Sequence, residues 1–440
     1  MAKRHWNRVS DFESLFLKLE DLVLANSGED EFEEVFKLLI AKLWDEYRGG
    51  EDRFVRYKTP QETFDEVSTL LLEAERGWMG ILEGDSSIKL TPEHLQVCVE
   101  ALSAHNILGS DFQVLDCFFE FLVARSAKGA KGQFFTPRHV IELCVRMLAP
   151  SPDDKVLDPA CGSGGFLLHT LEYVRKTHDL DTEAMTQYCD SRLWGFDISL
   201  RAVKVAKALM ILASNRQANI LRLNSLLRND SPVLFPVAGT EASESTDFSI
   251  EDVCRTRMKR HSGFDLILTN PPFAGEVRES HILNGFELSR SKYRVERDVL
   301  FVERCVNLLR PGGRMAIVLP HNKFAGSSFS YLREWVLDKA QVMAVIGLGR
   351  NTFLPHTHQK ASILVVKRRE AGTLVTNSLG EKTFFAISEK DGKNSKGQVI
   401  TLKGVDESEP VWGKVDHDFE EIVEAYRRFL EDSNPVPVGV

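Results

Sequence analysis

The sequence lacks the motifs of several common protein classes. Its seven cysteines stand singly at positions 98, 117, 144, 161, 189, 254 and 305, without a CxxC pair or zinc-site spacing. Reduced and mostly buried thiols are therefore expected. His356 and His358 have no carboxylate or cysteine at ligand spacing, so we predict no bound metal. A GxxxxGK[ST] segment is also absent, which argues against a P-loop nucleotide triphosphatase.

Long apolar runs are missing as well. No stretch approaches the roughly 18 apolar residues of a membrane span, and the first residues, MAKRHWNRVSDF, lack the apolar segment of a signal peptide. We therefore expect a cytoplasmic protein with no membrane partner. The net charge of −9 argues against nucleic-acid contacts over the whole surface. Any such contact should be local, or shared with a partner.

What is present is the composition of an ordinary globular protein, with 440 residues, 43% hydrophobic and 27% charged. Residues 10 to 125 show helical periodicity, and Thr91-Pro92-Glu93 has the pattern of a helix start. A Gly- and Lys-rich break at 126–137 follows. Strand-like and helical segments then alternate, which predicts a mostly parallel, doubly wound α/β sheet with an N-terminal α-helical domain. The expected strands lie at 155–157, 193–198, 219–223, 264–269, 314–319, 342–346 and 363–366.

From these changes of pattern we expect three regions: an N-terminal helical domain at 1–128, a catalytic domain at 129–370, and a C-terminal tail with one helix at 371–440. The tail has a polar loop, a helical segment around 419–430 and a Pro-rich end.

The segment KVLDPACGSGGFLLHTLEYV, 155–174, combines a buried strand, a glycine turn and a helix start. Glycines let the backbone approach a ligand, and the helix N-terminus offers free amides. A nucleotide-type cofactor would fit there, outside the strand ends. Asp158 precedes the turn and could meet a cationic group, whereas Asp197 ends the next strand and could accept both ribose hydroxyls. Each acid could equally be a helix cap.

The segment FDLILTNPPFAG, 264–275, ends an apolar strand with two prolines, which cannot donate to a sheet ladder and which stiffen the loop. Together with DPACGSGGFL and the upstream GQFFTPRHV, this NPPF segment resembles the amino-group (N6-adenine) DNA methyltransferases, most closely the modification subunit of type I restriction-modification systems. The resemblance implies a class I S-adenosylmethionine-dependent methyltransferase fold and methyl transfer from S-adenosyl-L-methionine to a flipped-out adenine in double-stranded DNA.

The resemblance also implies roles for particular residues. The expected catalytic residues are Asn270, Pro271, Pro272 and Phe273. The Asn270 side-chain oxygen and the Pro271 carbonyl would accept hydrogen bonds from the adenine amino group, while Phe273 would stack on the base. The expected cofactor-binding residues are Gln133, Phe135, Thr136, Pro137, Asp158, Pro159, Ala160, Gly162, Ser163, Gly164, Gly165, Phe166, Asp197 and Asn224. Asn224 stands where the family often has an acid. Phe353 would face the target base, or pack in the core.

No cysteine follows a proline, so a C5-cytosine methyltransferase nucleophile is absent. Recognition of the DNA site is expected to need a separate specificity subunit, and a restriction subunit could also associate. The C-terminal helix and the N-terminal helices are the expected docking surfaces. The cations Arg290, Lys292, Arg294 and Arg297 follow the NPPF loop and could contact phosphates or form a solvated face. Methylation of RNA or of a protein glutamine, and a non-catalytic scaffold, remain alternatives.

Overall fold

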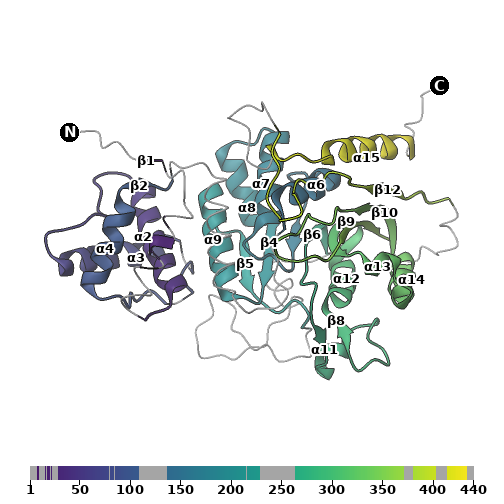
Figure 1. Cartoon of the computed structure of the whole chain (residues 1–440), viewed down its shortest axis with the longest axis horizontal. Helices are drawn as coiled ribbons and strands as arrows, with labels where there is room; N and C mark the ends of the chain where they lie inside the picture. Colours follow the sequence, from purple (N-terminus) through teal and green to yellow (C-terminus); the bar gives the residue numbers. More distant parts are fainter. Residues whose placement is uncertain are drawn as a thin grey trace. The chain divides into compact units, whose positions relative to one another are not determined.

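The computed structural model describes residues 28–108, 136–227, 263–370, 380–402 and 414–433, apart from positions 79, 84 and 215, and a few residues before position 28. Contacts divide the chain into two compact units, Met1–Gly129 with Leu200–Gln217, and Ala130–Ser199 with Ala218–Val440. Figure 1 shows the elements of both.

The first unit is mainly helical. Its helices are α2 (Glu31–Arg48), α3 (Pro60–Gly77), α4 (Pro92–Ser103) and α9 (Leu200–Ser214), and its short strands are β1 (Asn7–Arg8) and β2 (His105–Asn106). The expected helix start at Thr91 is confirmed, because its side chain accepts a hydrogen bond from the His94 backbone and Pro92 opens α4. Thr59 and Glu62 form a capping box at the start of α3.

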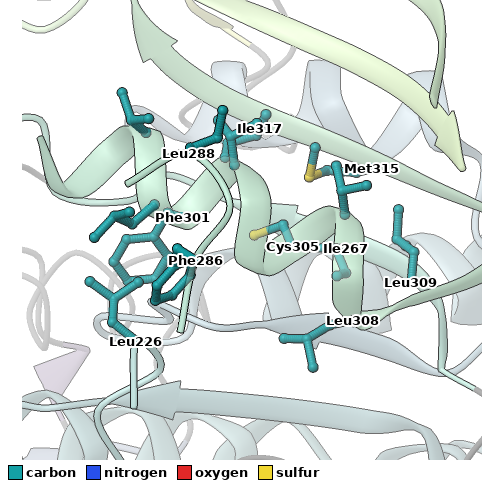
Figure 2. Packing of buried hydrophobic residues seen from close by; sticks show 14 of the residues in the cluster. Leu226, Ile267, Phe286, Leu288, Phe301, Cys305, Leu308, Leu309, Met315 and Ile317 are labelled. Carbon is teal, nitrogen blue, oxygen red and sulfur yellow. The ribbon is translucent and has the colours of Figure 1, made fainter. Parts of the chain in front are cut away.

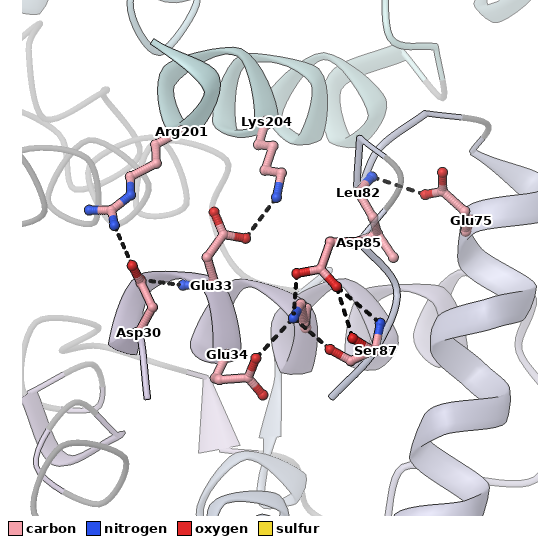
Figure 3. Close-up of polar contacts among 10 residues, drawn as sticks. Asp30, Glu33, Glu34, Glu75, Leu82, Asp85, Ser87, Arg201 and Lys204 are labelled. Carbon is pink, nitrogen blue, oxygen red and sulfur yellow. Dashed lines mark hydrogen bonds and ion pairs between the residues drawn. The ribbon is translucent and has the colours of Figure 1, made fainter. Parts of the chain in front are cut away.

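Helix α9 joins this unit through cations on one side that pair with acids of the N-terminal segments. Arg201 lies 2.5 Å from Asp30, and Lys204 lies 2.7 Å from Glu33 (Figure 3). Lys204 is buried, so breaking its pair would leave an uncompensated charge in the interior. The pairs therefore fix the register of α9 on α2.

The second unit is built on an eight-stranded sheet, counted over the described residues, in the order β12-β10-β11-β9-β6-β3-β4-β5. Strand β11 runs antiparallel to both of its neighbours, and the other pairs are parallel. The strands are β3 (Val156–Asp158), β4 (Leu193–Asp197), β5 (Asn219–Arg222), β6 (Phe264–Thr269), β9 (Leu309–Pro320), β10 (Ala340–Gly347), β11 (Ala361–Arg368) and β12 (Phe384–Ile387). All seven expected strands are confirmed. A small ribbon pairs β7 (Glu276–Val277) with β8 (Val295–Glu296).

The helices of this unit are α6 (Arg138–Leu148), α7 (Gly165–Thr177), α8 (Thr182–Arg192), α11 (Ser280–Leu283), α12 (Arg297–Leu308), α13 (Asn322–Ala325), the 3-10 turn η1 (Ser327–Phe329), α14 (Ser330–Lys339) and α15 (Phe419–Ser433). One face of the sheet packs against α12, and Ile267, Met315 and Ile317 point toward Phe301 and Cys305 (Figure 2). The opposite face of the sheet packs against α7, where Gly195 of β4 lies against Leu167. Helices therefore cover both faces of the sheet.

Two further expectations concern the interior and the membrane. Cys98, Cys144, Cys161, Cys189 and Cys305 are free and buried, as expected, whereas Cys117 and Cys254 lie outside the described residues. Across the described part of the chain, none of the helices combines the length and apolarity needed to cross a bilayer.

Candidate functional site

A pocket of about 50 Å³ opens at the carboxyl ends of β3 and β6. Strand β3 is the point where the sheet order reverses, because β4 lies on one side of it and β6 on the other. Ligands of open α/β sheets bind in such crevices. The lining residues are Thr136, Arg138, Ile141, Asp158, Ala160, Cys161, Gly162, Ser163, Gly165, Phe166 and Asn270. The pocket thus brings together residues from all three sequence motifs, which lie up to 134 positions apart.

The glycine turn shapes one wall of this pocket. Gly164 has a φ of 88°, a conformation that side chains disfavour, and it precedes the first turn of α7. The next residue, Gly165, allows a close approach: a Cβ added there would lie 2.0 Å from an Arg138 guanidinium nitrogen and 2.9 Å from Ile141. A side chain at this position would therefore require the ends of the Arg138 and Ile141 side chains to move.

Asp158 is the carboxyl group in the pocket lining, which also holds the cation Arg138, and the Asp158 side chain is 1% exposed. Its Oδ1 accepts hydrogen bonds from the Thr269 hydroxyl at 2.7 Å and from the Ala160 backbone N–H at 3.0 Å. Burial raises the pKa of this carboxyl to about 7, and the nearby charge of Asp197 adds to the rise. A cation beside it would restore the ionised form. The site is thus suited to a positively charged ligand.

Asp197, at the end of β4, supports the glycine turn. Its Oδ2 accepts from the Gly162 backbone at 3.0 Å and its Oδ1 from the Ser199 backbone at 2.8 Å. Burial raises the pKa of this carboxyl too. Each carboxylate oxygen can accept more than one hydrogen bond, so both keep capacity for a ligand hydroxyl.

Asn270 follows β6 and is oriented by Thr136 of the TP segment. The Asn270 Nδ2 donates to the Thr136 hydroxyl oxygen at 2.8 Å. The Asn270 Oδ1 is buried and finds no hydrogen-bond partner among the described residues. A buried acceptor left unpaired costs about 1–3 kcal/mol, and such an atom next to a pocket is a candidate for binding a donor from a ligand.

The two aromatic candidates, Phe273 and Phe353, contact each other. Their ring centroids lie 5.6 Å apart with an interplanar angle of 65°, an edge-to-face arrangement. Phe353 is 2% exposed, so it forms part of the packing that supports Phe273 in this structure.

Other candidates lie away from the pocket lining. The Asn224 Oδ1 accepts from the Leu226 backbone at 3.1 Å, inside its own turn. That turn is tied to the glycine segment by the Ser225 hydroxyl, which donates to the Pro159 carbonyl at 2.5 Å. The candidates outside the pocket lining are Pro137, Pro159, Gly164, Asp197, Asn224, Pro271, Pro272, Phe273 and Phe353. Gln133 and Phe135 lie outside the described residues.

The predicted site residues did not include Thr269, nor Arg138, Ile141 and Cys161 of the pocket lining. Thr269 directly precedes Asn270 and donates to Asp158, while Arg138 directly follows the TP segment and lines the pocket. Their adjacency to two motifs was a usable signal, because the backbone at the carboxyl end of a strand and at the start of a nearby helix lies beside the crevice where ligands bind.

The C-terminal segment packs on the helix that begins at the TP segment. Arg146 of α6 forms a two-pronged ion pair with Glu420 of α15, with one N–O distance of 2.7 Å. His139 stacks on His417 and Phe419 at 5.5 Å between centroids, and burial lowers the pKa of His139 to about 3. The apolar side of α15 is therefore occupied within the unit.

The strand order and the crevice define a class I S-adenosylmethionine-dependent methyltransferase fold. A protein assigned to that class from Listeria monocytogenes superposes with a TM-score of 0.50 at 14% identity, covering 81% of this chain and 92% of the other. The methyltransferase subunit of a type I restriction-modification system from Streptococcus thermophilus gives a TM-score of 0.60 at 16% identity, covering 98% and 94%. These identities establish the fold alone.

The family follows from the sequence. The N-6 DNA Methylase family model matches residues 111–424, and the chain belongs to this family. It is 28% identical over 241 residues to the type I restriction enzyme EcoKI methylase subunit of Escherichia coli (strain K12). The aligned region covers 52% of this chain and 39% of that protein. It is 24% identical over 299 residues to the MpnII methylase subunit of Mycoplasma pneumoniae, covering 64% and 50%. The chain thus spans about two fifths to one half of these relatives.

Proposed function

We propose that this protein is an adenine-specific DNA N6-methyltransferase and serves as the modification subunit of a type I restriction-modification system. The observation that carries the proposal is the Asn270 side chain, whose amide nitrogen is held by Thr136 while its oxygen stays unpaired among the described residues. Family membership and the resemblance to methylase subunits of type I enzymes support it.

The pocket residues fit S-adenosyl-L-methionine. A Cβ at Gly165 would press on the Arg138 side chain, and Asp158 is a buried carboxyl whose ionised form a cationic partner would stabilise. When bound, this cofactor supplies a methyl group that is activated on a sulfonium. Asp158 would lie near its amino group or its positive charge, Asp197 would accept from its ribose hydroxyls, and Gly162 to Phe166 would contact it through the backbone. Arg138 lies against Gly165 and would have to yield room.

Asn270 and Pro271 would act on the adenine amino group, a weak nucleophile because its lone pair is delocalised into the ring. Two oxygens that accept its hydrogens favour a tetrahedral nitrogen and leave the lone pair free to attack. Acceptors that are already in place need no reorganisation during the reaction. Phe273 would stack on the extruded base, whose removal from the duplex costs roughly a few kcal/mol.

A separate specificity subunit is proposed as the partner that selects the DNA sequence. The support is that the relatives are named as methylase subunits of type I restriction enzymes. The buried side of α15 already packs within the second unit, through Phe419, Ile422, Val423 and Tyr426. Partner contacts of this helix would therefore use its charged, exposed side.

Replacement of the chromosomal gene in its own host tests the proposal. Asn270→Ala should abolish N6-methyladenine at one DNA sequence, whereas Asn284→Ala, at an exposed position in the same unit, should leave it unchanged. Modification-sensitive sequencing is the measurement. Unchanged methylation in the Asn270 variant contradicts the proposal, and methyl label found in RNA or in a protein glutamine instead would favour the alternative substrate classes.

A further inference from the structure

Residues 290–294, Arg-Ser-Lys-Tyr-Arg, are displayed on an arm that begins directly after the catalytic loop. The arm leaves Phe273 through Ala274 and Gly275, pairs Glu276–Val277 with Val295–Glu296, and returns into α12. The Gly275 carbonyl accepts from the Arg297 backbone at 3.1 Å, which closes its base. In Figure 1 β8 and α11 lie together at the lower edge of the second unit.

The middle of the arm, at residues 286–288, is anchored in the core. Phe286 and Leu288 are buried in the core beside α12 (Figure 2). Glu303 of α12 accepts from the backbone N–H groups of Glu287 and Leu288, both at 2.8 Å. Hydrogen bonds to the backbone and contacts in the core thus hold the arm in a defined orientation before any ligand binds.

The tip carries an aromatic ring in solvent. Tyr293 is 76% exposed, an unusual degree for a large aromatic side chain. The Arg294 guanidinium lies 5.3 Å from its ring, and the Lys292 ammonium lies 3.0 Å from the ring of Tyr331 on α14. Lys292 therefore fastens the tip, while Tyr293 points away from the packed surface.

The charge of the tip contrasts with that of the chain. Residues 288–295 hold three cations and no acid, whereas the whole chain has a net charge of −9. Arg294 lies 3.4 Å from Glu276, but both side chains are substantially exposed, and such a pair contributes little. Among the residues that the structure describes, no ion pair engages Arg290. At least one guanidinium is thus free for an anion.

The tip is also within reach of a duplex held at the site. Val277, four residues after Phe273, pairs with Val295, two residues after Tyr293. Six residue steps and one crossing between strands bound their backbone separation at about 26 Å. One turn of DNA is about 34 Å long. Tyr293 therefore lies closer to the catalytic loop than the length of one turn of DNA.

We propose that this tip is a DNA contact beside the target base, in which Arg290 and Arg294 bind phosphates and Tyr293 inserts as a wedge at a base step. An exposed aromatic between cations suits this task, because the ring can enter between neighbouring base pairs while the cations contact the phosphates on either side. The inference rests on the proposed function and adds to it the residues that hold DNA next to the catalytic loop. It assigns sequence-independent holding to this chain, and leaves sequence reading to a partner.

Fluorescence anisotropy of the full-length protein with a mixed-sequence 30-base-pair duplex tests the contact without cofactor. Arg290→Gln with Arg294→Gln should lower the slope of log K against log salt by about 1.8, because each phosphate contact contributes about 0.9. Tyr293→Ala should weaken binding at least about fivefold, because the wedge at the base step is lost, and Tyr293→Phe should restore it. Phe385→Ala, on an aromatic of β12 that is 73% exposed, is the matched control.

An unchanged affinity and slope in the tip variants overturns the inference and would mark the tip as a protein-binding surface instead. So does a failure of the wild-type protein to bind the duplex at 50 mM salt. The proposed function fails separately, if the tip variants lose DNA binding as expected while the host DNA keeps its methylation in the Asn270→Ala strain.

Discussion

The buried carboxyl of Asp158 should make cofactor binding depend on pH. Its side chain is 1% exposed, and burial raises its pKa to about 7 from a usual value of 3.8. If the cationic cofactor binds only the ionised carboxylate, binding below pH 7 must first expel a proton. The affinity should then fall about tenfold for each pH unit below 7, and be about thirtyfold weaker at pH 5.5 than above pH 7.5.

Titration calorimetry of S-adenosyl-L-methionine into the full-length protein between pH 5.5 and 8.5 measures this dependence. Asp158→Asn should bind weakly and with a shallower slope over that range, because the largest proton exchange at the site is removed. Asp153→Asn, an exposed acid near the same strand, should behave as the wild type does. A flat wild-type profile, or an equal slope in Asp158→Asn, would refute the reasoning.

Stability gives an independent measure of the same group. As the pH rises above 3.8, the unfolded chain ionises Asp158 while the folded chain keeps its proton, so this residue lowers stability up to pH 7 and the full loss persists above it. The rise from 3.8 to about 7 corresponds to about 4 kcal/mol at most. Asp158→Asn should therefore be more stable than the wild type at pH 8, and nearly equal to it at pH 3.5.

Two further predictions concern single contacts. Thr136→Val removes the hydroxyl oxygen that accepts a hydrogen bond from Asn270 at 2.8 Å, so the rate of single-turnover methylation should fall about two- to tenfold. Thr136→Ser should keep a rate near that of the wild type. Equal rates for the two variants would contradict the orienting role of Thr136. Gly77→Ala would place a Cβ 1.9 Å from the ring of Trp44, so thermal unfolding should show a loss of about 1–3 kcal/mol, against almost none for Leu72→Ala at an exposed position of the same helix.

Much of the second unit could be predicted because its strands are buried on both faces. Such strands form continuous apolar runs, as in Phe264–Thr269, and the glycine turn and the NPPF loop follow two of them directly. The carboxyl ends of neighbouring parallel strands meet at one edge, so the sequence alone indicated that Asp158 and Asn270 lie together. Both residues line the same pocket in the structure.

What the sequence could not supply were contacts between distant segments. The Thr136–Asn270 hydrogen bond joins residues 134 positions apart, and no local pattern encodes it. The packing of α9 in the first unit could not be predicted for the same reason. The sequence shows the cations at 201 and 204, but it does not show that they pair with Asp30 and Glu33. The role expected of Asn224 at the cofactor stays a prediction; its oxygen accepts a hydrogen bond from the Leu226 backbone within its own turn, a contact that the spacing of motifs does not show.

The unpaired oxygen of Asn270 has a consequence for the choice between bases. Adenine and cytosine carry an exocyclic amine that would satisfy this buried atom, whereas guanine and thymine present a carbonyl at the corresponding edge and would set lone pair against lone pair. A site that is built to accept a hydrogen bond from a substrate rejects a substrate without the donor strongly, because the buried acceptor of the protein is then left unpaired. A single atom would thus refuse a keto base even after it had been drawn out of the helix.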